Sequence, residues 1–280
     1  MKKISRRSFL AASGLTIAAL ALTACGGSAS TASSAASSVA ASSEAASTSA
    51  AAAELTTVEA GKLTMATNAA FPPYEMTTDA GAFEGIDIDT AQAIADKLGL
   101  ELQIDDMDFD AALLSVQQGK ADIAMAGVTV TDERKNVMDF SDSYATGIQS
   151  IIVPEGSDIA SPDDLAGKMI GTQRGTTGYI YCSDDFGDDA VVAYDDGLTA
   201  VQALNNGQVD AVVIDNAPAK EFVAANPGLV LLDTSYAEED YAIGMAKGNT
   251  ALEDAVNAAL EELKADGTLQ SIVDKDITAE

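Results

Sequence analysis

The chain has 280 residues, with 44 acidic and 15 basic side chains, a formal net charge of −29, no histidine and two cysteines. This charge argues against a nucleic-acid-binding protein, which needs clustered lysine and arginine to neutralise phosphates. The lack of histidine excludes imidazole triads and histidine-ligated metal sites, and two cysteines are too few for a four-thiolate zinc site or a disulfide framework. The sequence is 47% hydrophobic but only 5% aromatic, which indicates an excess of alanine.

Residues 1–24 have the three zones of an export signal. A basic start (Lys2, Lys3, Arg6 and Arg7) is followed by an apolar stretch at 10–22 and by small residues before Cys25. The apolar stretch is shorter than the roughly 20 residues of a membrane-spanning helix, so it is predicted to be a signal peptide and not an anchor. Residues 5–10 also resemble a twin-arginine export motif, and the choice between the two export routes stays open.

Leu22-Thr23-Ala24-Cys25 resembles a lipobox, the bacterial lipoprotein signal in which the cysteine is diacylated and becomes the new N-terminus. The alternative is an ordinary cleavage site with an incidental cysteine. Two glycines and a long Ser/Ala tract follow, which favours the lipoprotein. We therefore expect a lipid on Cys25 to hold the exported protein at the outer face of the bacterial cytoplasmic membrane.

Residues 25–58 are predicted to be a flexible tether. Between 26 and 53 the chain has 10 Ser and 12 Ala in 28 residues, with one charge and no aromatic residue. Such a segment cannot bury enough apolar surface to offset its ordering entropy. Removing residues 1–24 leaves 11 basic and 44 acidic residues, a net charge of −33, which suits solubility outside the cell. The second cysteine, Cys182, is expected to be a small buried residue.

From about residue 57, β-rich runs alternate with alanine-rich helical runs. Strands are predicted at 63–67, 101–105, 122–128, 149–153, 168–173, 190–194, 209–215, 229–233 and 241–245. Helices are predicted at 90–98, 110–118, 132–137, 198–205, 217–225 and 251–265. The clearest helix has Leu252, Val256 and Leu260 at four-residue spacing. This alternation predicts an α/β fold of mainly parallel sheets with helices on both faces.

Two stretches of the chain share one rhythm. Residues 118–124 read Gln-Gly-Lys-Ala-Asp-Ile-Ala, and residues 206–212 read Asn-Gly-Gln-Val-Asp-Ala-Val, each after a predicted helix. This internal similarity favours two similar α/β lobes. Because ligands bind at the carboxyl ends of strands in open α/β sheets, two such lobes facing each other predict a ligand-binding cleft.

Six short motifs occur in order: Phe71-Pro72-Pro73-Tyr74-Glu75, Gly85-Ile86-Asp87-Ile88-Asp89, Gly127-Val128-Thr129-Val130-Thr131-Asp132-Glu133-Arg134, Asp139-Phe140-Ser141, Gly175-Thr176-Thr177 and Val209-Asp210-Ala211-Val212-Val213-Ile214-Asp215. Together they resemble the family 3 bacterial solute-binding proteins of polar amino-acid ABC importers, which include histidine-, lysine/arginine- and glutamine-binding proteins. The resemblance covers 63–277. It implies a two-lobed, periplasmic-binding-protein-like (Venus flytrap) fold, with lobe 1 at 59–146 plus 241–280, lobe 2 at 147–240 and two hinge crossings.

A free amino acid presents a carboxylate and an ammonium, so its receptor needs a fixed cation and a fixed anion. The guanidinium of Arg134 suits a carboxylate, because its planar fork donates two parallel hydrogen bonds. Thr129 and the backbone N–H groups of the same turn are expected to complete that anion site. Spacing alone leaves open a surface pair of Arg134 with Asp132 or Glu133, worth under about 1 kcal/mol. The resemblance to the family places Arg134 on the ligand carboxylate.

Asp215 closes an apolar strand, where a carboxylate points into the expected cleft. The resemblance assigns it to the ligand ammonium, while the alternative is an N-cap for a helix starting near Pro218. Thr177 resembles the second-lobe residue that meets the ligand carboxylate. Its alternative is a helix N-terminus, and the two interpretations agree because such a terminus binds anions.

The resemblance also implies walls for the ligand side chain. Phe71 and Phe109 would pack against it, although core packing is the default for a single Phe. Asn68 matches a position that carries an acid in some relatives with basic ligands, so the neutral amide leaves the reading of charge open. Ala126 and Gly127 stand where the family often has serine, which leaves fewer hydroxyls and places more weight on backbone donors.

We therefore expect a monomeric substrate-binding lipoprotein, without catalytic residues, cofactor or metal. It would capture a free polar or cationic amino acid, docked first on Arg134, and deliver it to the permease of an ABC importer. The alternative is an enzyme on the same fold, similar to cyclohexadienyl dehydratases. Without histidine only carboxylates could do acid–base work, and no G-x-S-x-G or phosphate-binding glycine motif is present.

Overall fold

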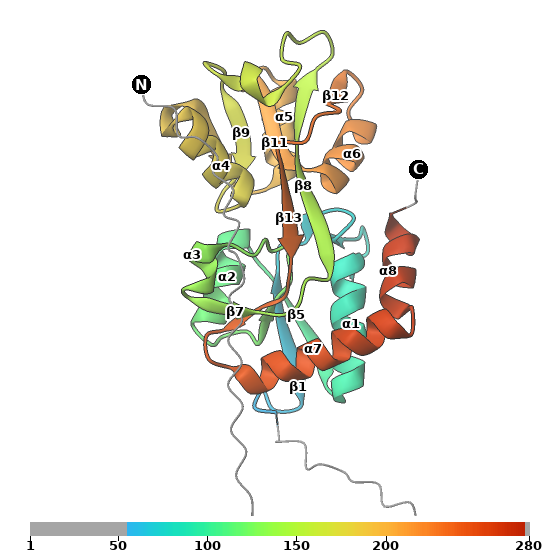
Figure 1. Ribbon diagram of the computed structural model, residues 1–280. Helices are drawn as coiled ribbons and strands as arrows, with labels where there is room; N and C mark the ends of the chain where they lie inside the picture. The colour runs from blue at the N-terminus through green and yellow to red at the C-terminus, as the bar shows by residue number, and fades with distance from the viewer. Residues whose placement is uncertain (1–54, 278–280) are drawn as a thin grey trace, which may run out of the picture. The chain divides into compact units, whose positions relative to one another are not determined.

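The computed structural model describes residues 55–277. The predicted signal peptide, Cys25 and most of the predicted tether lie outside the described residues. The described part forms a two-lobed α/β fold, in which each lobe is built on its own sheet (Figure 1). We call the part with the five-stranded sheet lobe 1 and the part with the six-stranded sheet lobe 2.

The sheet of lobe 1 has the strand order β5-β1-β6-β14-β7. The strands are β1 (Lys62–Thr67), β5 (Glu101–Asp106), β6 (Ile123–Ala124), β7 (Met138–Phe140) and β14 (Gly244–Ala246). β1 pairs in parallel with β5 and β6, while β14 runs antiparallel to β6 and β7. Five of the six residues of β1 are buried, as expected for a strand covered on both faces.

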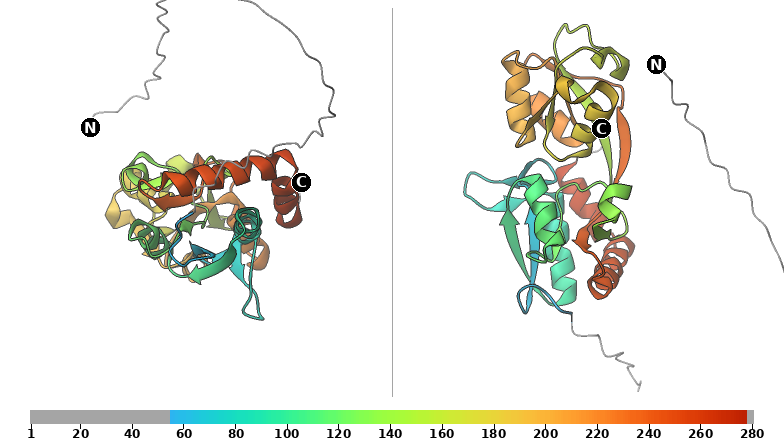
Figure 2. Two further views of the ribbon diagram at one scale, coloured as in Figure 1. Left: turned by 90° about the horizontal axis from the view of Figure 1, so that it is seen from below. Right: turned by 90° about the vertical axis from the view of Figure 1, so that its left-hand side faces the viewer.

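Helices cover both faces of this sheet. They are α1 (Ile86–Leu98), α2 (Phe109–Gln117), α3 (Asp132–Lys135), α7 (Thr250–Ala265) and α8 (Thr268–Asp276). Leu63 and Met65 of β1 pack with α1, α7 and α8, whereas Ala66 packs with α2 on the opposite face. Figure 2 shows α7, in red, lying across lobe 1. The side chains that predicted this helix, Leu252, Val256 and Leu260 among them, are buried.

A small three-stranded sheet precedes α1. Its strands are β2 (Ala70–Phe71), β3 (Glu75–Thr77) and β4 (Phe83–Glu84), which pair antiparallel in that order. Its first turn places Phe71 opposite Glu75, and both residues reach the functional site described below.

Lobe 2 has the strand order β10-β9-β11-β8-β12, with β13 also paired to β8. Its strands are β8 (Ala145–Pro154), β9 (Ile170–Gln173), β10 (Val191–Tyr194), β11 (Ala211–Asp215), β12 (Leu229–Leu231) and β13 (Ala237–Tyr241). Its helices are α4 (Thr177–Phe186), α5 (Gly197–Asn205) and α6 (Asn216–Ala225), with short 3₁₀ turns at Pro162–Leu165 and Asp188–Ala190. One core lies under α5 and α6, and a second lies under α4 and contains the buried Cys182.

Two neighbouring strands carry the chain between the lobes. β8 follows β7 of lobe 1, and β13 precedes β14 of lobe 1 (Figure 1). The two strands pair antiparallel, with Tyr241 opposite Ala145 and Ala237 opposite Gln149. Residues between these pairs therefore lie in reach of both lobes. Among residues 55–277, no helix is long and apolar enough to cross a membrane.

Every predicted strand and helix overlaps an observed element of the same type, but several bounds differ. The predicted strand 122–128 ends at Ala124, because the chain turns away before Gly127, whose φ is 54°. The predicted strand 241–245 is divided between two sheets, since Tyr241 ends β13 and Gly244 begins β14. The helices α4 and α8 were not predicted.

Candidate functional site

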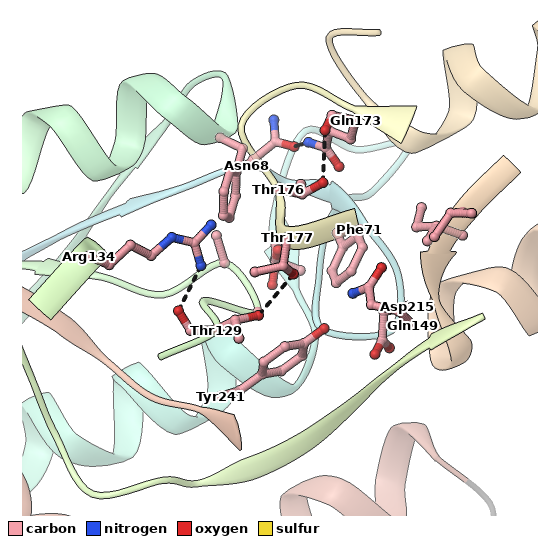
Figure 3. A pocket seen from close by; sticks show the side chains of 16 residues that line it. Asn68, Phe71, Thr129, Arg134, Gln149, Gln173, Thr176, Thr177, Asp215 and Tyr241 are labelled. Carbon is pink, nitrogen blue, oxygen red and sulfur yellow. Dashed lines mark hydrogen bonds between the residues drawn. The ribbon is translucent and has the colours of Figure 1, made fainter. Parts of the chain in front are cut away.

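Side chains from both lobes and both crossing strands line a pocket of about 430 Å³ (Figure 3). The lining residues are Asn68, Phe71, Glu75, Phe109, Ala126, Gly127, Thr129, Arg134, Gln149, Gln173, Thr176, Thr177, Val213, Ile214, Asp215 and Tyr241. All eight residues that the sequence placed around a ligand are in this set, so the structure brings them together.

Arg134 lies in the short helix α3, which the Thr131 hydroxyl caps by accepting from the Arg134 N–H at 3.1 Å. Its side chain is buried, and it donates from Nη1 to the Thr129 carbonyl at 2.7 Å and from Nη2 to the Gly175 carbonyl at 3.1 Å. The guanidinium carbon lies 5.3 Å from the centre of the Phe109 ring. The surface pair with Asp132 or Glu133 is therefore not what positions Arg134. A guanidinium has five N–H donors, so three are left for an anion in the pocket.

Burial of Arg134 has an electrostatic cost. Desolvation lowers the pKa of Arg134, while the negative charge of Glu239 opposes that shift. The group stays a cation, because the usual pKa of a guanidinium is so high. A buried cation whose N–H groups are only partly used by neutral carbonyls gains from an anionic ligand.

Thr177 begins helix α4, and the helix N-terminus opens toward the pocket. The Thr176 hydroxyl caps this helix by accepting from the Tyr179 N–H at 3.3 Å. Gly175, just before the cap, has a φ of 75°, a conformation that suits glycine. The free N–H groups of the first turn of a ten-residue helix form a partial positive charge. Thr177 thus lies both at a helix N-terminus and on the pocket wall, so its two interpretations are compatible.

Asp215 ends β11 and is 2% exposed. Its Oδ1 accepts from the Ala217 N–H at 3.1 Å and caps α6, so the N-cap alternative is present, although the helix begins at Asn216 and not near Pro218. Its Oδ2 accepts from the Ile148 N–H at 2.6 Å. Burial raises the pKa of Asp215 to about 6, and the two N–H donors partly offset that shift. The carboxylate also faces the pocket, so capping and ligand contact are compatible.

Aromatic side chains form one wall. Phe71 stacks on Tyr74 with ring centres 5.7 Å apart, and Tyr74 meets Tyr241 edge to face at 5.4 Å. A Cβ on Gly127 would lie 3.0 Å from the Phe71 ring and 3.2 Å from the Tyr241 ring. With its φ of 54° as well, Gly127 lets the backbone approach the aromatic wall in a way that another residue could not.

The amides of Asn68 and Gln173 join the lobes at another side of the pocket. Gln173 Nε2 of lobe 2 donates to Asn68 Oδ1 of lobe 1 at 2.8 Å, and Asn68 Nδ2 donates to the Met107 carbonyl at 3.0 Å. Both amides are buried, and the hydrogen bond between them is made away from water. Asn68 therefore lies at the contact between the lobes as well as on the pocket wall.

Glu75 and Asp87 form a buried carboxyl pair beside Gly127. Asp87 Oδ2 accepts from the Gly127 N–H at 3.0 Å and from the Tyr144 hydroxyl at 2.8 Å. Burial and the charge of Asp87 raise the pKa of Glu75 well above its usual value, while burial raises the pKa of Asp87 to about 6. Glu75 therefore holds a proton more strongly than an ordinary glutamic acid does. The Gly127 N–H is already used by Asp87, so it is not a free backbone donor for a ligand.

The sequence did not single out several residues of the site. Gln149 and Tyr241 lie on the crossing strands, and Gln173 ends β9. Glu239 lies behind the pocket and accepts hydrogen bonds from the pocket-lining hydroxyls of Thr129 and Thr177. Tyr241 is a large aromatic residue where one predicted strand begins, and that position could have marked it as a candidate for the pocket wall. Glu239 stands in a run of three acids that reads as a solvated strand face, so sequence alone offered no sign of its burial.

The pocket thus offers a cation, Arg134, and a helix N-terminus for one end of a ligand, and a carboxylate, Asp215, for the other. Phe71 and Phe109 supply apolar walls. Within residues 55–277, no group of three or more acidic or cysteine side chains is placed to hold a metal ion. The arrangement suits a small zwitterion.

Comparisons with known proteins agree with this geometry. The sequence profile of the bacterial extracellular solute-binding proteins, family 3, matches residues 63–278. The L-cystine-binding protein TcyJ of Escherichia coli (strain K12) is 33% identical over 221 residues, covering 78% of this chain and 83% of that protein. A probable histidine-binding protein of Neisseria gonorrhoeae is 32% identical and covers 94% and 93% of the two chains. The structure of an ancestral arginine-binding protein bound to arginine is 42% identical, with a TM-score of 0.74 and coverage of 78% and 98%.

Proposed function

The chain belongs to the bacterial extracellular solute-binding proteins, family 3, and from this membership and the geometry of its site we propose that it binds one free amino acid, with arginine as the first candidate. It is a solute-binding protein of the amino-acid ABC importer type and not an enzyme, and the relatives reported above are likewise named as binding proteins. The observation that carries the proposal is the pair of buried, oppositely charged side chains, Arg134 and Asp215, in one pocket.

The assignment of the two ligand ends follows from charge. The ligand carboxylate lies against Arg134 and the N-terminus of α4 at Thr177, with the turn at Thr129 beside them. The ligand ammonium lies against Asp215. Closing the lobes buries both ligand charges, which is favourable only because each has a partner of opposite sign.

The balance of buried charge favours a cationic side chain. Asp215 lines the pocket, and the buried carboxylates of Asp87 and Glu239 accept hydrogen bonds from pocket-lining residues. Among residues 55–277 the one buried cation is Arg134. The ends of an amino acid add no net charge, so a neutral ligand leaves the surplus of negative charge uncompensated. A guanidinium or ammonium side chain compensates it, and Phe71 and Phe109 can pack on its flat or apolar part. Arginine, lysine and ornithine are therefore preferred over glutamine.

A thermal-shift screen of the twenty amino acids together with cystine and ornithine tests the proposal. A ligand of micromolar affinity at millimolar concentration adds roughly 4 kcal/mol to the free energy of unfolding, which gives a clear rise in the melting temperature. We expect the cationic amino acids to give the largest rises. No rise with any amino acid would contradict the proposed function, and a rise with glutamine or cystine alone would contradict the preference for a cation.

The proposal includes the context of export. A signal peptide at 1–24, a lipid on Cys25 and a tether at 25–58 would hold a monomer at the outer face of the cytoplasmic membrane, from where it delivers its ligand to an ABC importer permease. Lobe boundaries at 59–146 plus 241–280 and at 147–240 belong to the same proposal. Labelling of cells with radioactive palmitate tests the lipid: Cys25→Ala should lose the label, and a labelled Cys25→Ala chain would contradict lipidation at this site.

The enzymatic alternative, a dehydratase on the same fold, has no support among the relatives reported above, which are named as binding proteins. An assay for prephenate turnover distinguishes the two functions, and detectable turnover would revive the enzyme.

A further inference from the structure

Glu239 is a buried carboxylate in the middle of the crossing strand β13. Its neighbours Glu238 and Asp240 are exposed, whereas Glu239 is 7% exposed, as the alternation of a strand requires. It does not line the pocket but lies behind the pocket-lining hydroxyls. Burying a carboxylate without a strong set of donors is costly, so its partners matter.

Three donors from three elements converge on one oxygen of Glu239. Oε2 accepts from Thr129 Oγ1 of lobe 1 at 3.1 Å, and from Thr177 Oγ1 of lobe 2 at 3.0 Å. It also accepts from Gln149 Nε2 of β8 at 3.0 Å. The carboxylate therefore joins the two lobes and both crossing strands at a single atom. Glu239 can accept from both hydroxyls because their oxygens, one from each lobe, lie 3.4 Å apart.

The two hydroxyls have little left to donate. A threonine hydroxyl has one proton, and both Thr129 and Thr177 use that proton toward Glu239. Their oxygens lie 3.4 Å apart, but neither then has a proton for the other. What the hydroxyls present to the pocket is lone pairs. The carboxylate of a ligand must accordingly be held by Arg134 and by backbone N–H groups. The two hydroxyls instead connect the lobes through Glu239.

Glu239 also supplies charge to the site. Its negative charge acts against the loss of the Arg134 cation, and burial together with that charge raises the pKa of Tyr181 to about 12. Tyr181 lies one turn after Thr177 in α4, so the face of α4 nearest the site is turned to Glu239. Glu239 thus holds Thr177 at the N-terminus of α4 by a hydrogen bond and acts on Arg134 through its charge.

We propose that Glu239 is the positioning residue that couples closure of the lobes to retention of the ligand, by accepting one hydroxyl hydrogen bond from each lobe. This rests on the proposed function. Glu239 does not touch the ligand, so its effect comes from the closed arrangement of Thr129, Thr177 and Arg134.

Calorimetric titration with L-arginine tests the coupling. Glu239→Gln keeps the shape and one acceptor but loses the charge, and should weaken affinity roughly fivefold, since hydrogen bonds to a charged group exceed neutral ones by about 1 kcal/mol. Glu239→Ala should weaken it further. Glu238→Gln removes the same charge from the exposed side of the strand and should stay within twofold of the wild type. An affinity of Glu239→Ala within twofold of the wild type overturns the proposal.

A double-mutant cycle separates coupling from mere destabilisation. Thr177→Val removes the hydroxyl and keeps the shape; it should weaken binding in the wild-type background and have little further effect beside Glu239→Gln. Equal effects in both backgrounds overturn the proposal. Because Glu239→Gln is nearly isosteric, the cycle remains usable if Glu239→Ala fails to fold.

A ligand-free measurement keeps the two proposals distinguishable. If the wild type binds no amino acid, the proposed function fails, and hydrogen exchange of the free protein then decides the role of Glu239. Glu239→Gln should speed amide exchange in β13 and in the first turn of α4, because the closed contact is weakened. Exchange equal to that of the wild type and of Glu238→Gln in both segments overturns the inference.

Discussion

Asp215 has two roles, as the cap of α6 and as the negative wall of the pocket, and Asp215→Asn separates them. The wild-type carboxylate has its pKa raised from 3.8 to about 6 by burial. An ammonium beside it favours the ionised form, so ligand binding must lower that pKa. Below pH 6, binding therefore requires release of the proton from Asp215. Above pH 7 the affinity should be flat.

The size of the effect follows from the titration. At pH 5 about one-tenth of Asp215 is ionised in the free protein, so affinity should be roughly tenfold lower than at pH 7.5. Asp215→Asn cannot pair with an ammonium in this way and should lose at least about a hundredfold in affinity, because breaking a buried charge pair costs about 3–5 kcal/mol. Its remaining affinity should no longer follow this titration.

Stability should respond differently from binding. The folded pKa lies above the unfolded value, so the contribution of Asp215 to stability is greatest below pH 3.8 and is lost as the pH rises through about 6. At pH 7.5 the ionised, buried carboxylate therefore lowers the free energy of unfolding by about 3 kcal/mol relative to low pH, and the neutral amide of Asp215→Asn avoids that loss. The amide leaves one of the N–H groups of Ile148 and Ala217 without an acceptor, a cost of roughly 1–3 kcal/mol. The free energy of unfolding should therefore change by no more than about 2 kcal/mol.

Calorimetric titration with L-arginine at pH 7.5, 6 and 5, in buffers of different ionisation enthalpy, measures affinity and released protons together. Chemical denaturation of both proteins at pH 7.5 gives the stability. A wild-type affinity that stays constant from pH 7.5 to 5 refutes the reasoning. So does a tenfold decline that persists in Asp215→Asn, because that decline would then belong to Asp87, whose pKa is also raised to about 6.

Three further substitutions test other parts of the account. Arg134→Ala should cost about 3–5 kcal/mol of binding in calorimetry, and retention of wild-type affinity would remove Arg134 from the anion site. Gly127→Ala should lower the free energy of unfolding by roughly 1–3 kcal/mol, measured in urea, and should weaken ligand binding. Gly81→Ala, also at positive φ but with open space around it, should leave ligand binding unchanged. Equal ligand affinities of the two variants would contradict the close contact of Gly127 with the aromatic wall. Asp196→Ala removes the cap of α5, a 2.6 Å bond from the Thr199 N–H, and should cost about 1 kcal/mol of stability with no change in affinity.

The regular part of the fold could be predicted from local patterns. The spacing of Leu252, Val256 and Leu260 gave α7 almost to the residue, because that helix has a strongly one-sided apolar face. Helix α4 buries only Thr177, Gly178 and Cys182, and these few positions make no clear periodic apolar run. Residues 241–245 were predicted as one strand because no polar residue interrupts the run. In the structure Tyr241 belongs to the sheet of lobe 2, and Gly244 and Met245 belong to the sheet of lobe 1.

The site was predictable where the ends of elements carry chemistry. Arg134, Thr177 and Asp215 each stand where a strand meets a helix or turn, and the structure places all three around one pocket. Gln149, Gln173 and Glu239 could not be found in this way. Their role depends on pairing between β8 and β13 and on contact between the lobes, and neither the sequence distance nor the residue type indicates it.

The central claim is that both charged ends of an amino acid are recognised in this pocket. Calorimetric titration with the amino acid that raises the melting temperature most, and with the amine formed by removing its carboxylate, tests it directly; for arginine that amine is agmatine. The account predicts one binding site for the amino acid and an affinity for the amine at least about a hundredfold lower, because Arg134 is then left buried without its anion. An amine that binds within tenfold of the amino acid would contradict it.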